Sequence, residues 1–194
     1  MLLIGVRNAA IACKPVGQAG SVAWDGKEER RMTVSLRESM AVIADPRNLD
    51  ASVEEVFEMM VGLKCRRTTA SEPPAYHTAS VTAVVGFGGL LSGACIFRLG
   101  SETAIKVAAH MTGIEFAEVD DTVKDAVGEV CNMLAGSWKG KVPELAANCG
   151  LSVPAVITGS DYNLHVQAPE FQLHHAYAFE GHTFAVTIVC DGMQ

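Results

Sequence analysis

The chain has 194 residues, of which 49% are hydrophobic, and a formal net charge of −7. This length and composition allow one domain with a full hydrophobic core that needs no disulfide or metal for stability. The charge is uneven, because residues 1–48 carry net +2 (seven Lys and Arg, five Asp and Glu) and residues 49–194 carry net −9 (eight against seventeen). An acidic body argues against nucleic-acid binding, which needs Lys and Arg to neutralise phosphates, and favours a protein or small-molecule partner.

The cysteines and the N-terminus indicate a cytoplasmic location. Six cysteines are spread along the chain without CxxC spacing: Cys13, Cys65, Cys95, Cys131, Cys149 and Cys190. Several lie in apolar runs, so we expect reduced thiols that act as small hydrophobic residues. The first apolar run is too short for a signal peptide and contains Arg7, and no stretch approaches the ~20 apolar residues of a membrane span. We expect a soluble cytoplasmic protein.

A change of pattern near Pro46 divides the chain. Residues 1–48 form an N-terminal extension, in which 21–24 and 31–36 are weak candidates for short strands around a turn. In residues 49–194, helical and strand patterns alternate clearly. We therefore predict an extension of uncertain order at 1–48 and one domain at 49–194.

A helix opens this domain. Asp50 is its expected N-cap, and the helix is expected to run through residues 51–63. Its apolar residues recur at helical spacing and include Val53, Val56, Phe57, Met60 and Val61. We interpret Met59 and Met60 as core residues rather than as a recognition groove.

Two strands and a shorter helix follow. The β-branched and apolar runs within residues 77–99 predict two strands around a glycine turn at 86–89. This "GFGG" stretch is not read as a phosphate loop, because no Lys followed by Ser or Thr comes after it. Ser101 then opens a helix that Gly113 closes.

The second long helix is expected from about Asp121 to Lys141, before Pro143. Three strand patterns follow it, at 151–158, 171–179 and 183–189. The order of helix, two strands, helices and three strands predicts an α+β fold, in which two long helices cover one face of a largely antiparallel sheet.

The second long helix has two contrasting sides. Its core side carries Val123, Val127, Val130, Leu134 and Trp138. At about 100° per residue, Asp125, Glu129, Asn132 and Gly136 gather within roughly 60° on the opposite side. Glycine inside a helix lowers the stability of the helix by about 1 kcal/mol relative to alanine. Gly128 and Gly136 therefore suggest a surface without protruding side chains, which a docking partner can approach closely. Ordinary solvated residues are the alternative interpretation.

The string Asp125-x3-Glu129-x2-Asn132 resembles the signature of the CheC/CheX/FliY family of chemotaxis phosphatases, D/S-x3-E-x2-N. The flanking "NMLAG" is similar to the CheX branch, and the resemblance covers roughly residues 49–194. It implies a pseudo-twofold α+β fold. The first helix offers Glu54, Glu55 and Glu58 but no Asn, so one site is expected, as in CheX.

The resemblance implies hydrolysis of the aspartyl phosphate on a CheY-like receiver domain. Asn132 would hold the attacking water in line, and Glu129 would pair with the receiver's lysine, while Asp125, Gly128 and Gly136 would belong to the docking surface. A carboxamide both donates and accepts hydrogen bonds, so it can orient a water. No cofactor or metal of this chain is implied, because Mg²⁺ is expected with the receiver.

The resemblance also implies a homodimer joined through sheet edges, and we expect the apolar last strand, 183–189, to leave such an edge.

Two rival functions remain open. The same fold can serve as a non-catalytic adaptor, although intact Glu129 and Asn132 favour the enzyme. A weaker alternative is a small-ligand domain that uses His174, His175 and His182; adjacent histidines in a strand point to opposite faces, so we do not expect a metal site there. Cys131 has no neighbouring base in the sequence, so we do not expect a thiol nucleophile.

Overall fold

The computed structural model describes residues 42–68, 80–160, 162, 164–165 and 169–193. The helices are α2 (Pro46–Val56), the π-helical segment η1 (Phe57–Val61), α3 (Ser101–Thr112), α4 (Asp121–Gly140) and α5 (Pro143–Asn148). The strands are β1 (Arg66–Arg67), β2 (Ser80–Gly89), β3 (Leu91–Gly100), β4 (Cys149–Leu151), β5 (Ala155–Gly159), β6 (Phe171–Phe179) and β7 (His182–Met193). The weak strand candidates at 21–24 and 31–36 lie outside the described residues.

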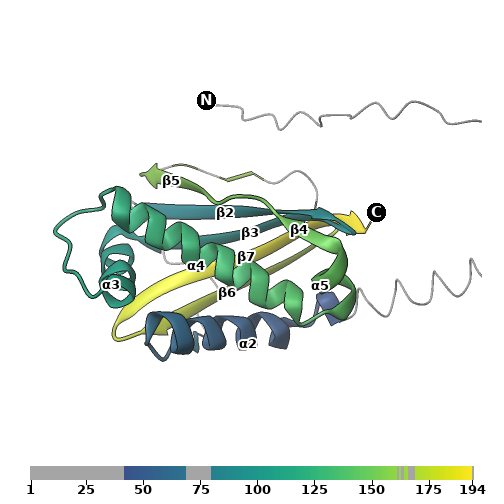
Figure 1. Cartoon of the computed structure of the whole chain (residues 1–194), viewed down its shortest axis with the longest axis horizontal. Helices are drawn as coiled ribbons and strands as arrows, with labels where there is room; N and C mark the ends of the chain where they lie inside the picture. The colour runs from purple at the N-terminus through teal and green to yellow at the C-terminus, as the bar shows by residue number, and fades with distance from the viewer. Residues whose placement is uncertain (1–41, 69–79, 161, 163, 166–168, 194) are drawn as a thin grey trace, which may run out of the picture.

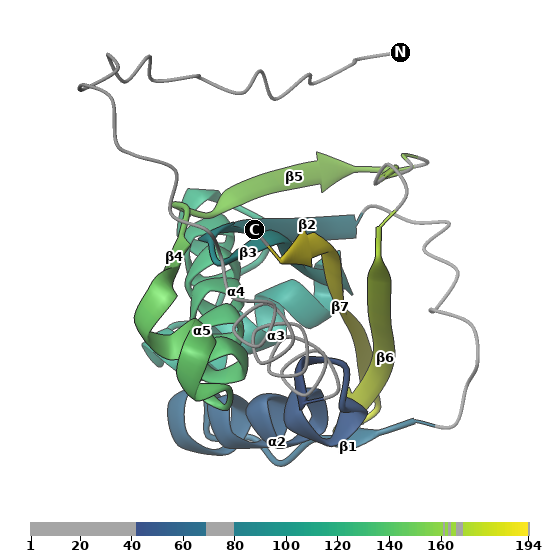
Figure 2. The same ribbon diagram turned by 90° about the vertical axis from the view of Figure 1, so that its right-hand side faces the viewer.

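Within the described residues, seven strands form one sheet in the order β1-β6-β7-β3-β2-β4, and β5 also pairs with β2. Every pairing between these strands is antiparallel. The sheet is curved, and α2, α3 and α4 lie on its inner side (Figures 1 and 2). The predicted α+β class, with two long helices on one face of an antiparallel sheet, is confirmed.

The fold has a pseudo-twofold arrangement about the central pair of strands, β3 and β7. Each half contains a long helix, a short edge strand and a hairpin: α2, β1 and β2–β3 in the first, α4, β4–β5 and β6–β7 in the second. The edge strands are exchanged, because β1 pairs with β6 of the second half and β4 and β5 pair with β2 of the first. Each half therefore completes the sheet of the other.

Aromatic side chains form the core between α2 and the central strands. The rings of Phe57 and Phe184 stack with centroids 4.4 Å apart, and Phe97 meets both rings edge-on. On the α4 side, Trp138 is fully buried and packs against Phe87 of β2. Burial of such large rings is the main contribution to the stability of a core, and here it fixes both long helices on the sheet.

The start of the first long helix differs from the prediction. Asp45, not Asp50, is the N-cap: its Oδ1 accepts a hydrogen bond from the Arg47 N–H at 2.9 Å, and Pro46 occupies the first turn. Proline is favoured at the first helical position because it lacks the N–H that would be unpaired there. Asp50 therefore lies within α2, in contact with the sheet.

The interpretation of Met59 and Met60 as core residues is wrong. They are 74% and 54% exposed, respectively, whereas Phe57 and Val61 are buried. The reason is η1: a π-helical turn closes from residue i to i+5 and takes an extra residue per turn. The apolar stripe therefore shifts, so that Phe57 and Val61 stay buried while Met60, which the α-helical period also placed on the stripe, is exposed. Gly62, with φ 74°, ends the segment.

The expected sheet edge is also wrong, because β7 lies between β3 and β6 and both its edges are paired. The edges of the described sheet are β1 on one side and β4 and β5 on the other. Residues 86–89 belong to β2 itself, and the hairpin turns at Leu90. The helix at 101–112 and its Gly113 cap agree with the prediction.

Candidate active site

Helix α4 is a firmly held support for the predicted site. Its N-cap is Asp120, whose Oδ1 accepts a hydrogen bond from the Val123 N–H at 2.9 Å. Near its C-terminus, Lys139 Nζ donates to the carbonyls of Ala146 and Cys149, which fastens the following segment to the helix. The predicted core side is buried throughout: Val123, Val127, Val130, Leu134 and Trp138. A helix that is capped and packed in this way holds its outer side chains in a defined orientation.

The structure places the predicted site residues together on the outer side of α4. Asp125 and Glu129 are exposed and Asn132 is half-buried. Residues three apart on a helix are neighbours, with about 5–6 Å between their Cβ atoms, so the Glu129 carboxylate and the Asn132 carboxamide lie side by side. Within the described part of the chain, neither side chain makes a hydrogen bond or an ion pair. Both functional groups are therefore free to contact a partner.

Gly128, one of the two glycines of α4, packs tightly against another part of the same chain. Gly128 is buried, and a Cβ atom there would meet Pro154 Cβ and Val156 Cγ2, each at 3.3 Å. Gly136 faces Leu151, whose Cδ1 would lie 4.0 Å from an added Cβ. The expectation that Gly128 leaves room for a partner is thus corrected, because side chains of the β4–β5 segment of the same chain occupy that space.

Acidic residues dominate the N-terminal half of the outer side of α4. Lys124 pairs with Asp121, Nζ to Oδ1 at 2.8 Å, and the hydrogen bond from Lys124 lowers the pKa of the Asp121 carboxyl. Asp125 lies near enough to Lys124 to help raise the pKa of that lysine. Glu129 adds a further carboxylate with no cation beside it among the described residues. This face suits a partner with a positively charged contact.

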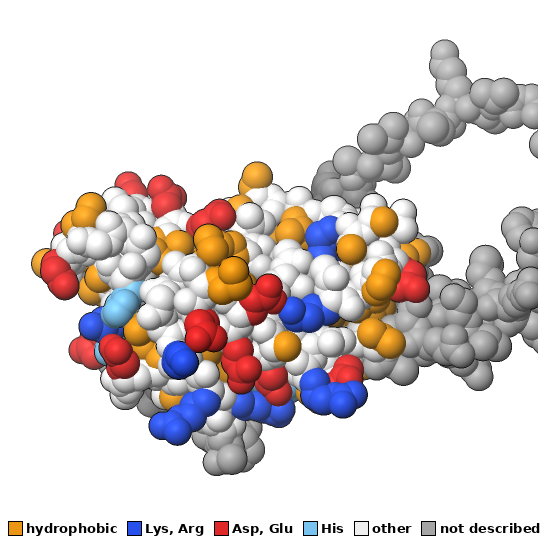
Figure 3. All heavy atoms as spheres, turned by 60° about the horizontal axis from the view of Figure 1, so that its bottom comes forward, with side chains coloured by type: hydrophobic (Ala, Val, Ile, Leu, Met, Phe, Trp, Pro, Cys, Tyr) orange, Lys and Arg blue, Asp and Glu red, His pale blue; other side chains and the backbone are white. Residues whose placement is uncertain are grey.

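The acidic residues of α2 serve another purpose. Glu55 Oε2 accepts hydrogen bonds from Lys141 Nζ at 2.6 Å and from Ser137 Oγ at 3.1 Å, and these bonds lower the pKa of Glu55. They join α2 to the C-terminal end of α4. Figure 3, turned toward the α2 side of the molecule, shows acidic and basic side chains interspersed on this face. Glu55 therefore holds the two long helices together.

The histidines of β6 take part in local hydrogen bonds. His174 Nδ1 lies 2.7 Å from Thr187 Oγ1, and burial lowers the pKa of His174. His175 points to the other face of the strand, where its Nδ1 lies 2.8 Å from Asp50 Oδ1. In the part of the chain that the structure describes, no group of three or more His, Cys, Asp or Glu is arranged to hold a metal ion.

Asp50, which is half-buried, forms a polar cluster with the buried residues His175 and Tyr177, and the sequence pattern did not predict this cluster. Tyr177 is fully buried and donates its hydroxyl hydrogen to Asp50 Oδ1 at 2.8 Å, and burial raises the pKa of this tyrosine above its ordinary range. Arg67 Nη1 donates to Asp50 Oδ2 at 3.3 Å. His175 and Tyr177 are two residues apart in a strand and therefore lie on the same face, and this spacing is the sign of the cluster that the sequence contains. The cluster joins α2 to β1 and β6.

We expect Asp50→Ala to lower the free energy of unfolding by about 2–4 kcal/mol, because it leaves the buried side chains of Tyr177 and His175 without their acceptor. Urea denaturation measures this change. The matched control is Glu58→Ala, which removes an exposed pair with Lys64 and should cost less than about 0.5 kcal/mol. Equal stabilities for the two variants would contradict a structural role for the cluster.

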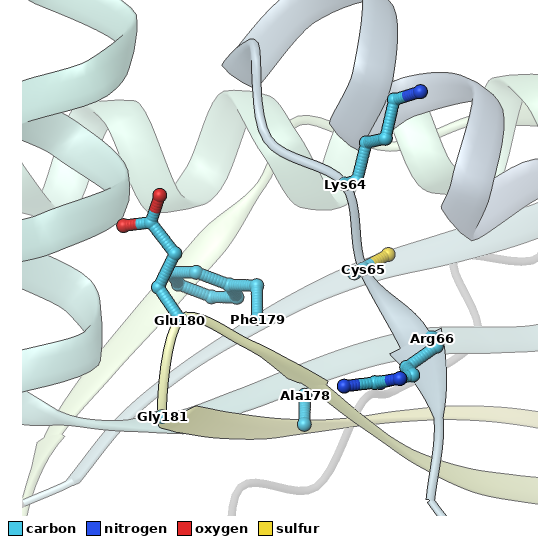
Figure 4. A pocket seen from close by; sticks show the side chains of 7 residues that line it. All are labelled: Lys64, Cys65, Arg66, Ala178, Phe179, Glu180 and Gly181. Atoms are coloured by element: carbon cyan, nitrogen blue, oxygen red, sulfur yellow. The ribbon is translucent and has the colours of Figure 1, made fainter.

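Another feature lies apart from the outer side of α4. A hollow of about 360 Å³ at the β6–β7 turn is lined by residues 64–66 and 178–181. There the Lys64 and Arg66 side chains point in different directions (Figure 4), and Lys64 pairs with Glu58 at 3.4 Å.

The described cysteines take no part in a site. Cys131 is fully buried, and its Sγ contacts the carbonyls of Ala83 and Cys95, so it cannot act as a nucleophile. The five described cysteines are free thiols, as expected; Cys13 lies outside the described residues.

Comparison with known proteins identifies the family. Residues 81–175 match the family described as chemotaxis phosphatase CheX. The chain is also 32% identical over 120 residues to the CheY-P phosphatase CheX of Thermotoga maritima, a match that covers 60% of this chain and 76% of that protein. This chain belongs to the CheX family. The matched region contains α4 and therefore Glu129 and Asn132.

Solved structures agree with this assignment to the CheX family. A CheX from Desulfovibrio desulfuricans is 25% identical, with a TM-score of 0.61 over 76% of this chain and 98% of that chain. The CheX of a CheX-CheY-BeF3-Mg²⁺ complex from Borrelia burgdorferi is similar in fold, at 21% identity, with a TM-score of 0.59 over 74% of this chain and 96% of that chain. The fold predicted from the CheX resemblance is thus confirmed. Every helix in the described residues is too short or too polar to span a membrane.

Proposed function

We propose that this chain is a phosphatase that hydrolyses the aspartyl phosphate of a CheY-like receiver domain. The observation that carries the proposal is the pair Glu129 and Asn132, side by side on the outer side of a rigid helix, with no partner among the described residues. Membership of the CheX family supports it, since the Thermotoga relative is a CheY-P phosphatase.

The chemistry divides between two side chains. The Asn132 carboxamide enters the receiver's site, accepts a hydrogen bond from the attacking water and holds it in line with the phosphorus–oxygen bond that breaks. An amide is neutral, so it can approach a phosphoryl group that would repel a carboxylate. The Glu129 carboxylate pairs with the active-site lysine of the receiver and fixes the docking geometry.

The receiver supplies the remaining chemistry, including the phosphorylated aspartate and Mg²⁺. The Borrelia CheX was solved in a complex that contains CheY and Mg²⁺, which supports this division. Asp125 and Glu129 add negative charge beside a partner site that carries a lysine and a divalent cation, which favours association. We assign Asp125 and Gly136 to the docking surface.

The test measures loss of aspartyl phosphate from a purified CheY-like receiver with and without the full chain. Phosphate release faster than the receiver's own hydrolysis supports the proposal. Phosphorylated receivers encoded near this gene are the first substrates to try. Binding of such receivers without any acceleration would instead favour a non-catalytic adaptor.

We also propose a cytoplasmic homodimer. Free thiols and a cytoplasmic partner domain support the location. The β4–β5 edge of the sheet offers unpaired backbone groups for a second copy, in place of the last strand, which is central in the sheet.

A further inference from the structure

The β4–β5 segment runs along α4 in the opposite direction and passes the proposed site. Leu151 faces Gly136, and Pro154 and Val156 face Gly128. Gly128 and Gly136 lie one turn before and one turn after Asn132 on the same stripe of the helix. Residues 152 and 153 therefore pass beside Asn132. Figure 1 shows this segment following α4 from α5 toward β5.

This segment contains a β-bulge at Val153 and Pro154. On one side of the bulge Leu151 is opposite Phe87 and the Ser152 N–H donates to the Gly86 carbonyl at 2.9 Å; on the other side Ala155 is opposite Val84. Two residues, Val153 and Pro154, therefore oppose the single residue Val85. Val85 is buried on the face that carries the helices, so the bulge turns Val153 and Pro154 toward the α4 side.

The bulge is held in a fixed shape. Ser152 Oγ accepts a hydrogen bond from the Gly86 N–H at 2.8 Å and donates one to the Val153 carbonyl at 2.9 Å. The Pro154 ring packs over Gly128. Val153 is nonetheless 85% exposed, the most exposed large hydrophobic side chain in the described part of the chain. An apolar side chain held rigidly in solvent loses little conformational entropy when it binds a partner.

We propose that Val153 is an apolar docking contact for the receiver domain, placed by the bulge beside Asn132. The proposal rests on the proposed phosphatase function. It adds a prediction about the receiver: an apolar side chain on the rim of the receiver's active site contacts Val153. This contact lies on the side of Asn132 away from Glu129. Glu129 then anchors one side of the receiver through charge, and Val153 anchors the other through burial of apolar surface.

Steady-state phosphate release from a phosphorylated receiver tests this contact. Val153→Ser should raise KM about tenfold and leave kcat unchanged, because the lost contact is the same in the ground state and the transition state. Val153→Ile should keep wild-type KM. The control is Val42→Ser, which removes another exposed valine, 44% exposed, that lies before α2. Thermal unfolding should show equal Tm values for Val153→Ser and wild type.

Other outcomes separate the possible failures. Equal KM values for Val153→Ser and Val42→Ser, with an active wild type, would overturn the docking contact and leave the phosphatase function intact. A change only in the molar mass measured by light scattering would assign Val153 to contact between copies and would also overturn it. An inactive wild type would remove the phosphatase function and this contact with it.

Discussion

Asn132→Ala should reduce kcat for phosphate release on the order of 10²-fold or more and leave receiver binding largely intact. The reason is that the Asn132 carboxamide orients the attacking water only as the reaction proceeds, so its loss raises the barrier without weakening docking. Asn132 lies on the outer side of α4 with no hydrogen bond to other described residues, so its replacement should not disturb the fold. Steady-state phosphate release and receiver binding by titration measure the two effects.

Two further variants sharpen this prediction. Asn132→Asp keeps the shape but places a negative charge beside the phosphoryl group, so it should be at least as inactive as Asn132→Ala. Glu58→Ala, on η1, should retain wild-type kcat because its carboxylate pairs with Lys64 away from α4. Wild-type activity in Asn132→Ala would contradict the proposed chemistry and favour the adaptor.

Glu129→Ala should weaken docking as well as turnover. We expect KM to rise about tenfold and kcat to fall, because the variant loses an ion pair with the receiver's lysine that also fixes the orientation of the receiver. An ion pair is screened by salt, so the ratio of mutant to wild-type KM should decrease as ionic strength rises. The same ratio for Asn132→Ala should be independent of salt.

The matched control for Glu129 is Asp125→Ala, which removes a carboxylate one turn earlier on the same side of α4. A general loss of negative charge would give both variants the same KM and the same salt response. A specific pair predicts a larger effect at Glu129. Kinetics measured at several salt concentrations distinguish these two results.

The spacing of apolar residues predicted the buried side of α4 correctly and that of η1 incorrectly. The apolar residues of α4 keep a regular 3.6-residue spacing over its length, so both its buried side and its outer residues followed from the pattern. In η1 the hydrogen-bonding pattern changes at Phe57, and a single extra residue moved Met60 from the expected core to the surface. Nothing in the composition of residues 57–61 marks a π-helical turn.

The order of the strands in the sheet also could not be predicted from the sequence pattern. The strand patterns of β6 and β7 were recognised, but strand order depends on contacts between distant residues, so β7 was assigned to an edge when it is central. The bulge had a local signal, since Pro154 within a strand pattern marks an edge or a bulge. The Gly128 contact with Pro154 required the three-dimensional structure, because 26 residues of sequence separate them.

The exchange of edge strands between the two halves has a consequence for how the chain folds. The hairpin β2–β3 receives β4 and β5 from the second half, and β6–β7 receives β1 from the first. Each half would thus leave an unpaired hairpin edge and an uncovered apolar surface if it formed alone. The two halves must then fold in one cooperative transition, whose nucleus closes loops as long as that between Ser80 and Gly159. A nascent chain that has emerged only as far as α3 therefore has no stable sheet to form.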